Sequence, residues 1–96
     1  MSLNASPGFK FEIEKSAENS FARTGTLTTP NGVVETPAFI PVGTKATVKS
    51  VLPEAMRELG AQALLSNAYH LYLQPGPEIL DEAGGLSKFM NWNGPT

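Results

Sequence analysis

The sequence predicts an α/β fold, in which an antiparallel β meander over residues 9–36 is followed by strand–helix–strand units over residues 37–96. The first observation is the strict alternation of apolar and charged side chains from Phe9 to Glu14, which is typical of a half-buried strand. The second is a pair of apolar segments on either side of an amphipathic helix, the pattern of a βαβ unit. Nine glycines and eight prolines indicate many turns and short elements. We interpret residues 1–8 as a tag or disordered start.

The antiparallel strands are predicted from side-chain alternation and from a turn signal. Within residues 9–14 the apolar side chains fall at odd positions, so one face of this strand should be buried and the other solvated. Residues 21–29 continue in residue types that tolerate extended backbone. Asn31-Gly32 readily supplies the positive φ of a tight hairpin turn, and residues 33–36 would form the returning strand.

The βαβ unit is predicted from two apolar runs and the helix between them. The run over residues 38–42 has a proline near each end, which predicts a short buried strand. Pro53 suits the first position of a helix over residues 53–59, which Gly60 should end. Residues 62–66 predict a strand buried on both faces, parallel to the first and reached by a right-handed crossover. The inward face of the helix is expected to comprise Leu52, Ala55, Met56 and Leu59.

A second helix is predicted from Pro77 to Ala83, and Gly84-Gly85 should end it. A βαβ unit covered by one helix has open parallel edges, and 96 residues are too few for a complete (β/α)₈ barrel, which needs roughly 200 or more. The chain is therefore interpreted as cut from a larger fold, and we expect it to self-associate through its open edges and an exposed apolar tail. The apolar tail comprises Leu86, Phe89, Met90 and Trp92, of which the last three are expected to be exposed.

Composition narrows the classes of function. Seven basic and nine acidic residues give a net charge of −2, so no global basic field attracts nucleic acid. The chain has no cysteine, which excludes disulfides and thiolate metal sites within it and fits a cytoplasmic protein. No apolar run is long enough to span a membrane, and no membrane association is expected.

Candidate site residues follow the two predicted parallel strands, because α/β proteins gather function at the carboxyl ends of such strands. The first strand ends at Val42, and the second leads into Ser66-Asn67-Ala68-Tyr69-His70, which holds the only histidine of the chain. His70 lacks a second histidine or a cysteine at metal spacing, and a lone histidine in a mixed loop is more often structural. Asn67 is explained equally well as a cap for the following turn. The residues alone do not define a reaction.

Specific strings resemble a known enzyme family. Residues 36–44, Thr-Pro-Ala-Phe-Ile-Pro-Val-Gly-Thr, resemble the first barrel strand of the bacterial queuine tRNA-ribosyltransferases, also called tRNA-guanine transglycosylases. The resemblance extends from about Phe9 to Thr96, nearly the whole chain. The further matching strings, in chain order, are Glu58-Leu59-Gly60-Ala61, Asn67-Ala68-Tyr69-His70-Leu71, Gln74-Pro75-Gly76, Ala83-Gly84-Gly85-Leu86 and Phe89-Met90-Asn91-Trp92.

The resemblance implies an N-terminal antiparallel sheet and the first βα units of a TIM (β/α)₈ barrel, incomplete in this chain. Family members exchange guanine at the anticodon wobble position of tRNA for a 7-deazaguanine base, preQ1 in bacteria, through a covalent ribosyl-enzyme intermediate in queuosine biosynthesis. They are homodimers that carry Zn²⁺ near the C-terminus. The catalytic aspartates and zinc ligands would lie beyond Thr96, so the 96 residues alone are expected to hold no cofactor, metal ligand or catalytic residue and to be inactive.

The resemblance also implies roles for particular residues. Val42, Leu65, Ser66 and Asn67 would line or support the pocket for the tRNA ribose, while Tyr69 and His70 match the family motif as structural supports. The chain departs from the commonest bacterial pattern with Ser66 in place of glycine and Ala68 in place of threonine. The rival hypothesis is a stand-alone small α/β module that binds tRNA or a protein without catalysis.

Overall fold

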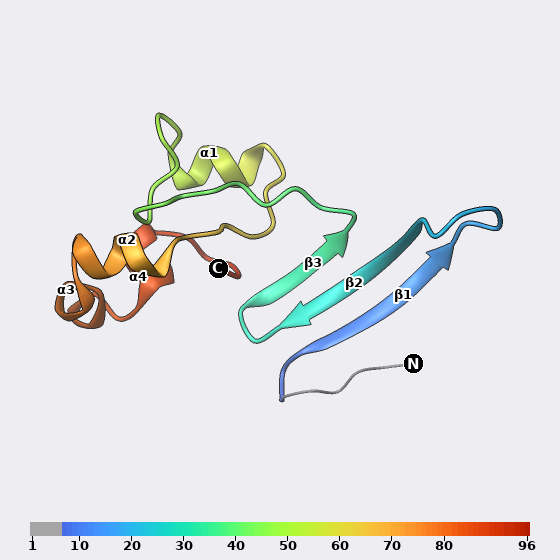
Figure 1. The fold of residues 1–96 in the computed structure, drawn as a ribbon, viewed down its shortest axis with the longest axis horizontal. Coiled ribbons are helices and arrows are strands. Elements are labelled where there is room, and N and C mark those ends of the chain that lie inside the picture. The colour runs from blue at the N-terminus through green and yellow to red at the C-terminus, as the bar shows by residue number, and fades with distance from the viewer. Residues whose placement is uncertain (1–6) are drawn as a thin grey trace.

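The computed structural model describes residues 7–96, so most of the segment interpreted as a tag or disordered start lies outside the described residues. Figure 1 shows three strands in one sheet and, beside it, a part built from short helices and extended segments. The strands are β1 (Lys10–Ser16), β2 (Arg23–Thr29) and β3 (Gly32–Thr36). The helices are α1 (Pro53–Glu58), α2 (Ala68–Leu73), α3 (Pro77–Glu82) and α4 (Leu86–Met90). Within the described residues, no helix is long and apolar enough to cross a membrane.

The sheet confirms the predicted antiparallel strands. Its order is β1-β2-β3, and both neighbouring pairs are antiparallel. The β2–β3 turn falls one residue earlier than the Asn-Gly signal predicts, with Pro30 and Asn31 between the paired residues Thr29 and Gly32. Proline suits the second position of a turn because its ring fixes φ near −65°. The Thr29 hydroxyl closes the turn, because it donates to the Gly32 carbonyl oxygen at 2.7 Å.

The burial predicted for one face of β1 is wrong. Phe9 and Ile13 are exposed, and Phe11 is half-buried. Phe11 lies over Gly25 of β2, where a Cβ atom would stand only 2.7 Å from the phenyl ring. The strands of the sheet contact chiefly one another, and a single sheet buries a face only where a second layer covers it. Alternation therefore identified the strand correctly but not its surroundings.

The two apolar runs of the predicted βαβ unit lie side by side in parallel, but they are not regular strands. One parallel bridge joins Val42 to Leu65. The Leu65 N–H donates to the Pro41 carbonyl oxygen at 2.9 Å, and the Gly43 N–H donates to the Leu65 carbonyl oxygen at 2.6 Å. Pro41 has no N–H to extend the ladder. On the opposite edge the Leu64 N–H donates to the Pro95 carbonyl oxygen at 3.1 Å, so residues 64–65 have neighbours on both sides.

The helices agree only partly with the sequence. The predicted helices from Pro53 and Pro77 are confirmed, whereas α2 and α4 were missed. Of the expected inward face of α1, Met56 is buried and Ala55 half-buried, but Leu52 and Leu59 are exposed. With six residues, α1 has fewer than two full turns, and Leu52 and Leu59 flank it as its N-cap and C-cap rather than belonging to the helix.

Most of the core lies among the helices and the extended segments, and the sheet adds the buried Val34 of β3. The core includes two residues that were expected in an exposed tail: Met90 is 5% exposed and Trp92 is 3% exposed. The helix α4 ends at Asn91, which adopts a left-handed conformation with φ 57°, and the Trp92 N–H donates to the Ser87 carbonyl oxygen at 2.9 Å. Phe89 stays partly exposed. The buried cluster comprises Ala46, Met56, Leu64, Leu71, Met90 and Trp92.

Candidate functional site

The ends of the two parallel segments form the candidate site. The Val42–Leu65 bridge brings them together, and the Asn67 N–H donates to the Thr44 carbonyl oxygen at 3.3 Å. The side chains of Val42 and Leu65 are 55% and 51% exposed. This edge therefore presents two neighbouring apolar side chains that, within the described residues, remain accessible for contact.

The loop that follows Val42 turns sharply. Gly43 is buried, and a Cβ atom there would stand 3.1 Å from the backbone of Thr47. The Ala46 N–H donates to the Gly43 carbonyl oxygen at 3.0 Å, and Ala46 itself has φ 64°. The tight turn leaves the Thr44 carbonyl oxygen directed at Asn67, which fixes the spacing between the two segment ends.

Asn67 is the N-cap of α2. Its side-chain oxygen accepts hydrogen bonds from the N–H groups of Tyr69 at 2.9 Å and His70 at 3.5 Å. These N–H groups belong to the first turn of the helix and would otherwise lack an intrahelical partner. Of the two explanations that the sequence left open for Asn67, the cap is confirmed. Asn67 is also exposed, so a ligand can reach it while it caps the helix.

Ser66 links the candidate site to the core. Its hydroxyl donates to the sulfur of Met90 at 3.7 Å, and the residue is half-buried. Sulfur is a weak acceptor, so this bond orients the hydroxyl rather than stabilising the fold strongly. A glycine at this position would lose that link to α4.

Tyr69 and His70 occupy the first turn of α2. Tyr69 is exposed and His70 is half-buried. Their rings meet edge to face, with centroids 5.6 Å apart and an interplanar angle of 76°. The predicted site residues are thus brought together in two groups, with Val42, Leu65, Ser66 and Asn67 at the segment ends and this aromatic pair on the adjoining helix.

The described residues do not fit the zinc site that the family resemblance implies elsewhere. Among residues 7–96, no three His, Cys, Asp or Glu side chains are grouped closely enough to hold a metal ion. The whole sequence has no cysteine and one histidine, so it cannot supply the set of four Cys and His ligands that structural zinc sites use.

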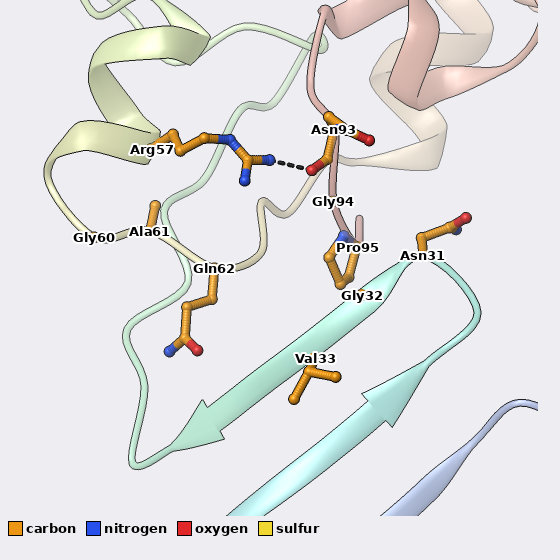
Figure 2. Close-up of a pocket in the computed structure, with 10 residues that line it drawn as sticks. All are labelled: Asn31, Gly32, Val33, Arg57, Gly60, Ala61, Gln62, Asn93, Gly94 and Pro95. Carbon is orange, nitrogen blue, oxygen red and sulfur yellow. Dashed lines mark hydrogen bonds between the residues drawn. The ribbon is translucent and has the colours of Figure 1, made fainter.

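A shallow depression of about 340 Å³ lies on a different part of the molecule. Figure 2 shows it between the β2–β3 turn, the segment after α1 and the C-terminal residues. Arg57 extends along this depression and donates to the Asn93 carbonyl oxygen. None of the predicted site residues lines it, so it is not part of the candidate site.

Sequence reasoning missed two contributors to the candidate site. Thr44 acts through its backbone carbonyl, which no side-chain pattern could reveal. Met90 approaches Ser66 from 24 positions further along the chain, and only the three-dimensional structure makes the two residues neighbours. The cap at Asn67 was the one local signal that could have revealed α2.

The described residues combine an antiparallel sheet with short helices and two extended segments joined by one parallel bridge, and polar residues follow the ends of these segments. This arrangement is that of an α/β protein. Sequence comparison makes the assignment specific. The family model described as queuine tRNA-ribosyltransferase matches residues 17–96. The chain belongs to this family.

Individual relatives agree with the family assignment. The chain is 61% identical over 88 residues to the queuine tRNA-ribosyltransferase of Desulforudis audaxviator, which covers 92% of this chain and 24% of the relative. It is 59% identical over 86 residues to that of Desulforamulus reducens, covering 90% and 23%. The Synechococcus elongatus enzyme is 55% identical over 87 residues, covering 91% and 23%. The chain spans about a quarter of the length of these relatives.

Replacing Asn67 by alanine should destabilise α2. The substitution removes the acceptor for the Tyr69 and His70 N–H groups, and the loss of such a cap typically costs about 1 kcal/mol. Urea denaturation followed by circular dichroism measures the change in the free energy of unfolding. Asn67→Ser is the matched control, because serine keeps a capping oxygen and should retain most of the stability. Equal stability of Asn67→Ala and the unaltered chain would contradict the assigned cap.

Proposed function

We propose that this chain is the N-terminal portion of a tRNA-guanine transglycosylase, which exchanges guanine at the anticodon wobble position of tRNA for preQ1 or queuine. The observation that supports this most strongly is the family match over residues 17–96. Identities of 55% to 61% over about nine-tenths of the chain support it further. Because tRNA is the proposed substrate, we place the protein in the cytoplasm.

The proposed architecture divides the chain at residue 37. Residues 9–36 form the antiparallel meander, and residues 37–96 form the first βα units of an incomplete TIM barrel. The parallel bridge between Val42 and Leu65 supports this arrangement. The bond from Leu64 to Pro95 on the other edge supports it as well, since every strand in a barrel has two neighbours.

The proposed role of the candidate site is to hold the tRNA ribose. Val42 and Leu65 offer apolar contact from the two segment ends, and both are about half exposed. Ser66 and Asn67 add polar groups immediately after Leu65. Tyr69 and His70 are assigned the role of supports for this edge, consistent with their mutual ring contact.

The proposed exchange requires two carboxylates. One attacks the anomeric carbon of the ribose as the guanine leaves with a proton from a general acid, and the deprotonated incoming base then displaces the enzyme carboxylate. The single aspartate of this chain, Asp81, lies on α3, and neither residues 36–53 nor residues 59–77, which hold the two segment ends, contain an aspartate or a glutamate. We therefore assign the reacting carboxylates and the Zn²⁺ site to the rest of a longer polypeptide.

The proposal also includes self-association, as a homodimer or otherwise. The described residues expose several large apolar side chains, among them Phe39, Leu59 and Tyr72, and such groups favour association in water.

The isolated 96-residue chain should show no exchange of labelled guanine into tRNA, because it has no carboxylates at the ends of its two parallel segments. A full-length family member, such as the Desulforudis audaxviator enzyme, is the positive control. Turnover by the isolated chain would contradict the proposal. The rival, a stand-alone tRNA-binding module, predicts micromolar and salt-dependent tRNA binding by the chain in a filter-binding titration. We expect only weak binding, because the net charge is −2.

A further inference from the structure

The outer edge of β3 is closed by a side chain. Gln62, in the segment that follows α1, makes two hydrogen bonds to the backbone of Glu35. Its side-chain oxygen accepts from the Glu35 N–H at 2.7 Å, and its side-chain nitrogen donates to the Glu35 carbonyl oxygen at 3.0 Å. Gln62 is half-buried, and Figure 2 shows its side chain projecting toward β3.

These two bonds reproduce what a neighbouring strand would provide. In an antiparallel sheet, a residue that exchanges both of its backbone bonds with one strand directs both groups to that side. Glu35 is aligned with Thr26 of β2, but its N–H and carbonyl are directed to Gln62 on the other side. The carboxamide of glutamine carries one acceptor and two donors, so it can satisfy both groups as a peptide unit would.

The same bonds join the two parts of the molecule. β3 belongs to the antiparallel sheet, whereas Gln62 lies three residues before Leu65 in the parallel pair. At the other end of β3 the two parts meet again, because Gly32 lies against the Pro95 ring. A Cβ atom on Gly32 would stand 3.2 Å from that ring. Between these two contacts lies the depression that Val33 and Gln62 help to line.

We propose that the Gln62 carboxamide acts as a one-residue substitute for a strand at the free edge of β3, which docks the sheet onto the parallel segments and blocks that edge against pairing with a second copy of the chain. Unpaired edge strands are templates for strand addition, and natural proteins commonly protect them. This role concerns the assembly of the fold and does not depend on the exchange reaction.

Hydrogen exchange measured by NMR tests the docking role. In Gln62→Leu, a substitution of similar size without polar groups, the Glu35 amide should exchange about fivefold to tenfold faster, corresponding to the loss of one hydrogen bond. Gln74→Leu is the matched control. Within the described residues the Gln74 side chain accepts one hydrogen bond, from the Lys45 ammonium at 3.4 Å, so its replacement should leave the Glu35 amide unchanged. Unchanged exchange at Glu35 in a folded Gln62→Leu variant would overturn the proposal.

Sedimentation velocity on the same variants tests the blocking role. Gln62→Leu should self-associate more tightly than Gln74→Leu, and equal association would overturn that role. If Gln62→Leu does not fold, NMR on the unaltered chain still tests the docking role. Nuclear Overhauser contacts between the Gln62 side-chain amide protons and the Glu35 backbone amide proton would support it, and their absence in the folded chain would overturn it.

Discussion

Replacing Trp92 by alanine should lower the free energy of unfolding by about 3 to 5 kcal/mol, the usual cost of removing a buried aromatic side chain. Trp92 is 3% exposed and belongs to the core cluster. Its indole N–H donates to the Pro95 carbonyl oxygen at 3.0 Å, and the Arg57 guanidinium lies 4.8 Å from its ring centre. The substitution thus removes apolar burial, a hydrogen bond and a cation–π contact together.

Urea denaturation followed by circular dichroism measures this loss. Tryptophan fluorescence cannot be used, because Trp92→Ala removes the only tryptophan of the chain. Trp92→Phe is the matched control. This variant loses the hydrogen bond to Pro95. Because it keeps an aromatic ring in the core, it should lower the free energy of unfolding less than the alanine variant does. A Trp92→Ala protein as stable as the unaltered chain would show that the segment after α4 does not pack as described.

Leu64→Ala should lower the free energy of unfolding by about 2 to 5 kcal/mol. Leu64 is only 2% exposed and lies in the same cluster as Met56 and Trp92. Its truncation would leave a cavity where the extended segment packs under the helices, and close-packed interiors relax only partly around such a gap. The neighbouring Leu65 provides a direct comparison.

Leu65→Ala is the control for Leu64→Ala. The two leucines are adjacent in the sequence, but the side chain of Leu65 is 51% exposed, so its truncation should cost clearly less than that of Leu64. Urea midpoints of the two variants under identical conditions give the comparison. Equal losses would contradict the assignment of one leucine to the core and the other to the accessible edge.

The parts of the fold that the sequence predicted are those set by local chemistry. The alternation in residues 9–14 identified β1, and prolines at positions 53 and 77 marked the first residues of α1 and α3. Two apolar runs around a helix predicted the parallel pair. Each of these signals acts within a few residues, where side-chain spacing and backbone restriction dominate.

The parts that the sequence did not predict depend on distant contacts. Met90 and Trp92 are buried in a cluster with residues distant in the sequence, and Arg57 of α1 lies over the Trp92 ring. The exposure of Phe9 and Ile13 arises because no second layer covers them within the described residues. Hydrophobic pattern indicates which faces could be buried, but it does not say what lies against them.

For the candidate site, the sequence predicted which two segment ends lie together but not the contacts between them. The rule that function gathers after parallel strands located Val42 and the stretch beginning at Ser66, and the structure brings these ends together. The Thr44 carbonyl and the Met90 sulfur became visible only in three dimensions. The ribose role of this edge remains a prediction.

A segment exchange with a full-length relative tests the central claim most directly. The 88-residue stretch of the Desulforudis audaxviator enzyme that aligns with this chain would be replaced by the corresponding residues of this chain, and guanine exchange into tRNA would be measured. We predict a chimera with activity near that of the unaltered relative, reduced when Asn67 is replaced by alanine. A folded, stable chimera that exchanges no guanine would contradict the proposal that this chain supplies the N-terminal portion of a tRNA-guanine transglycosylase.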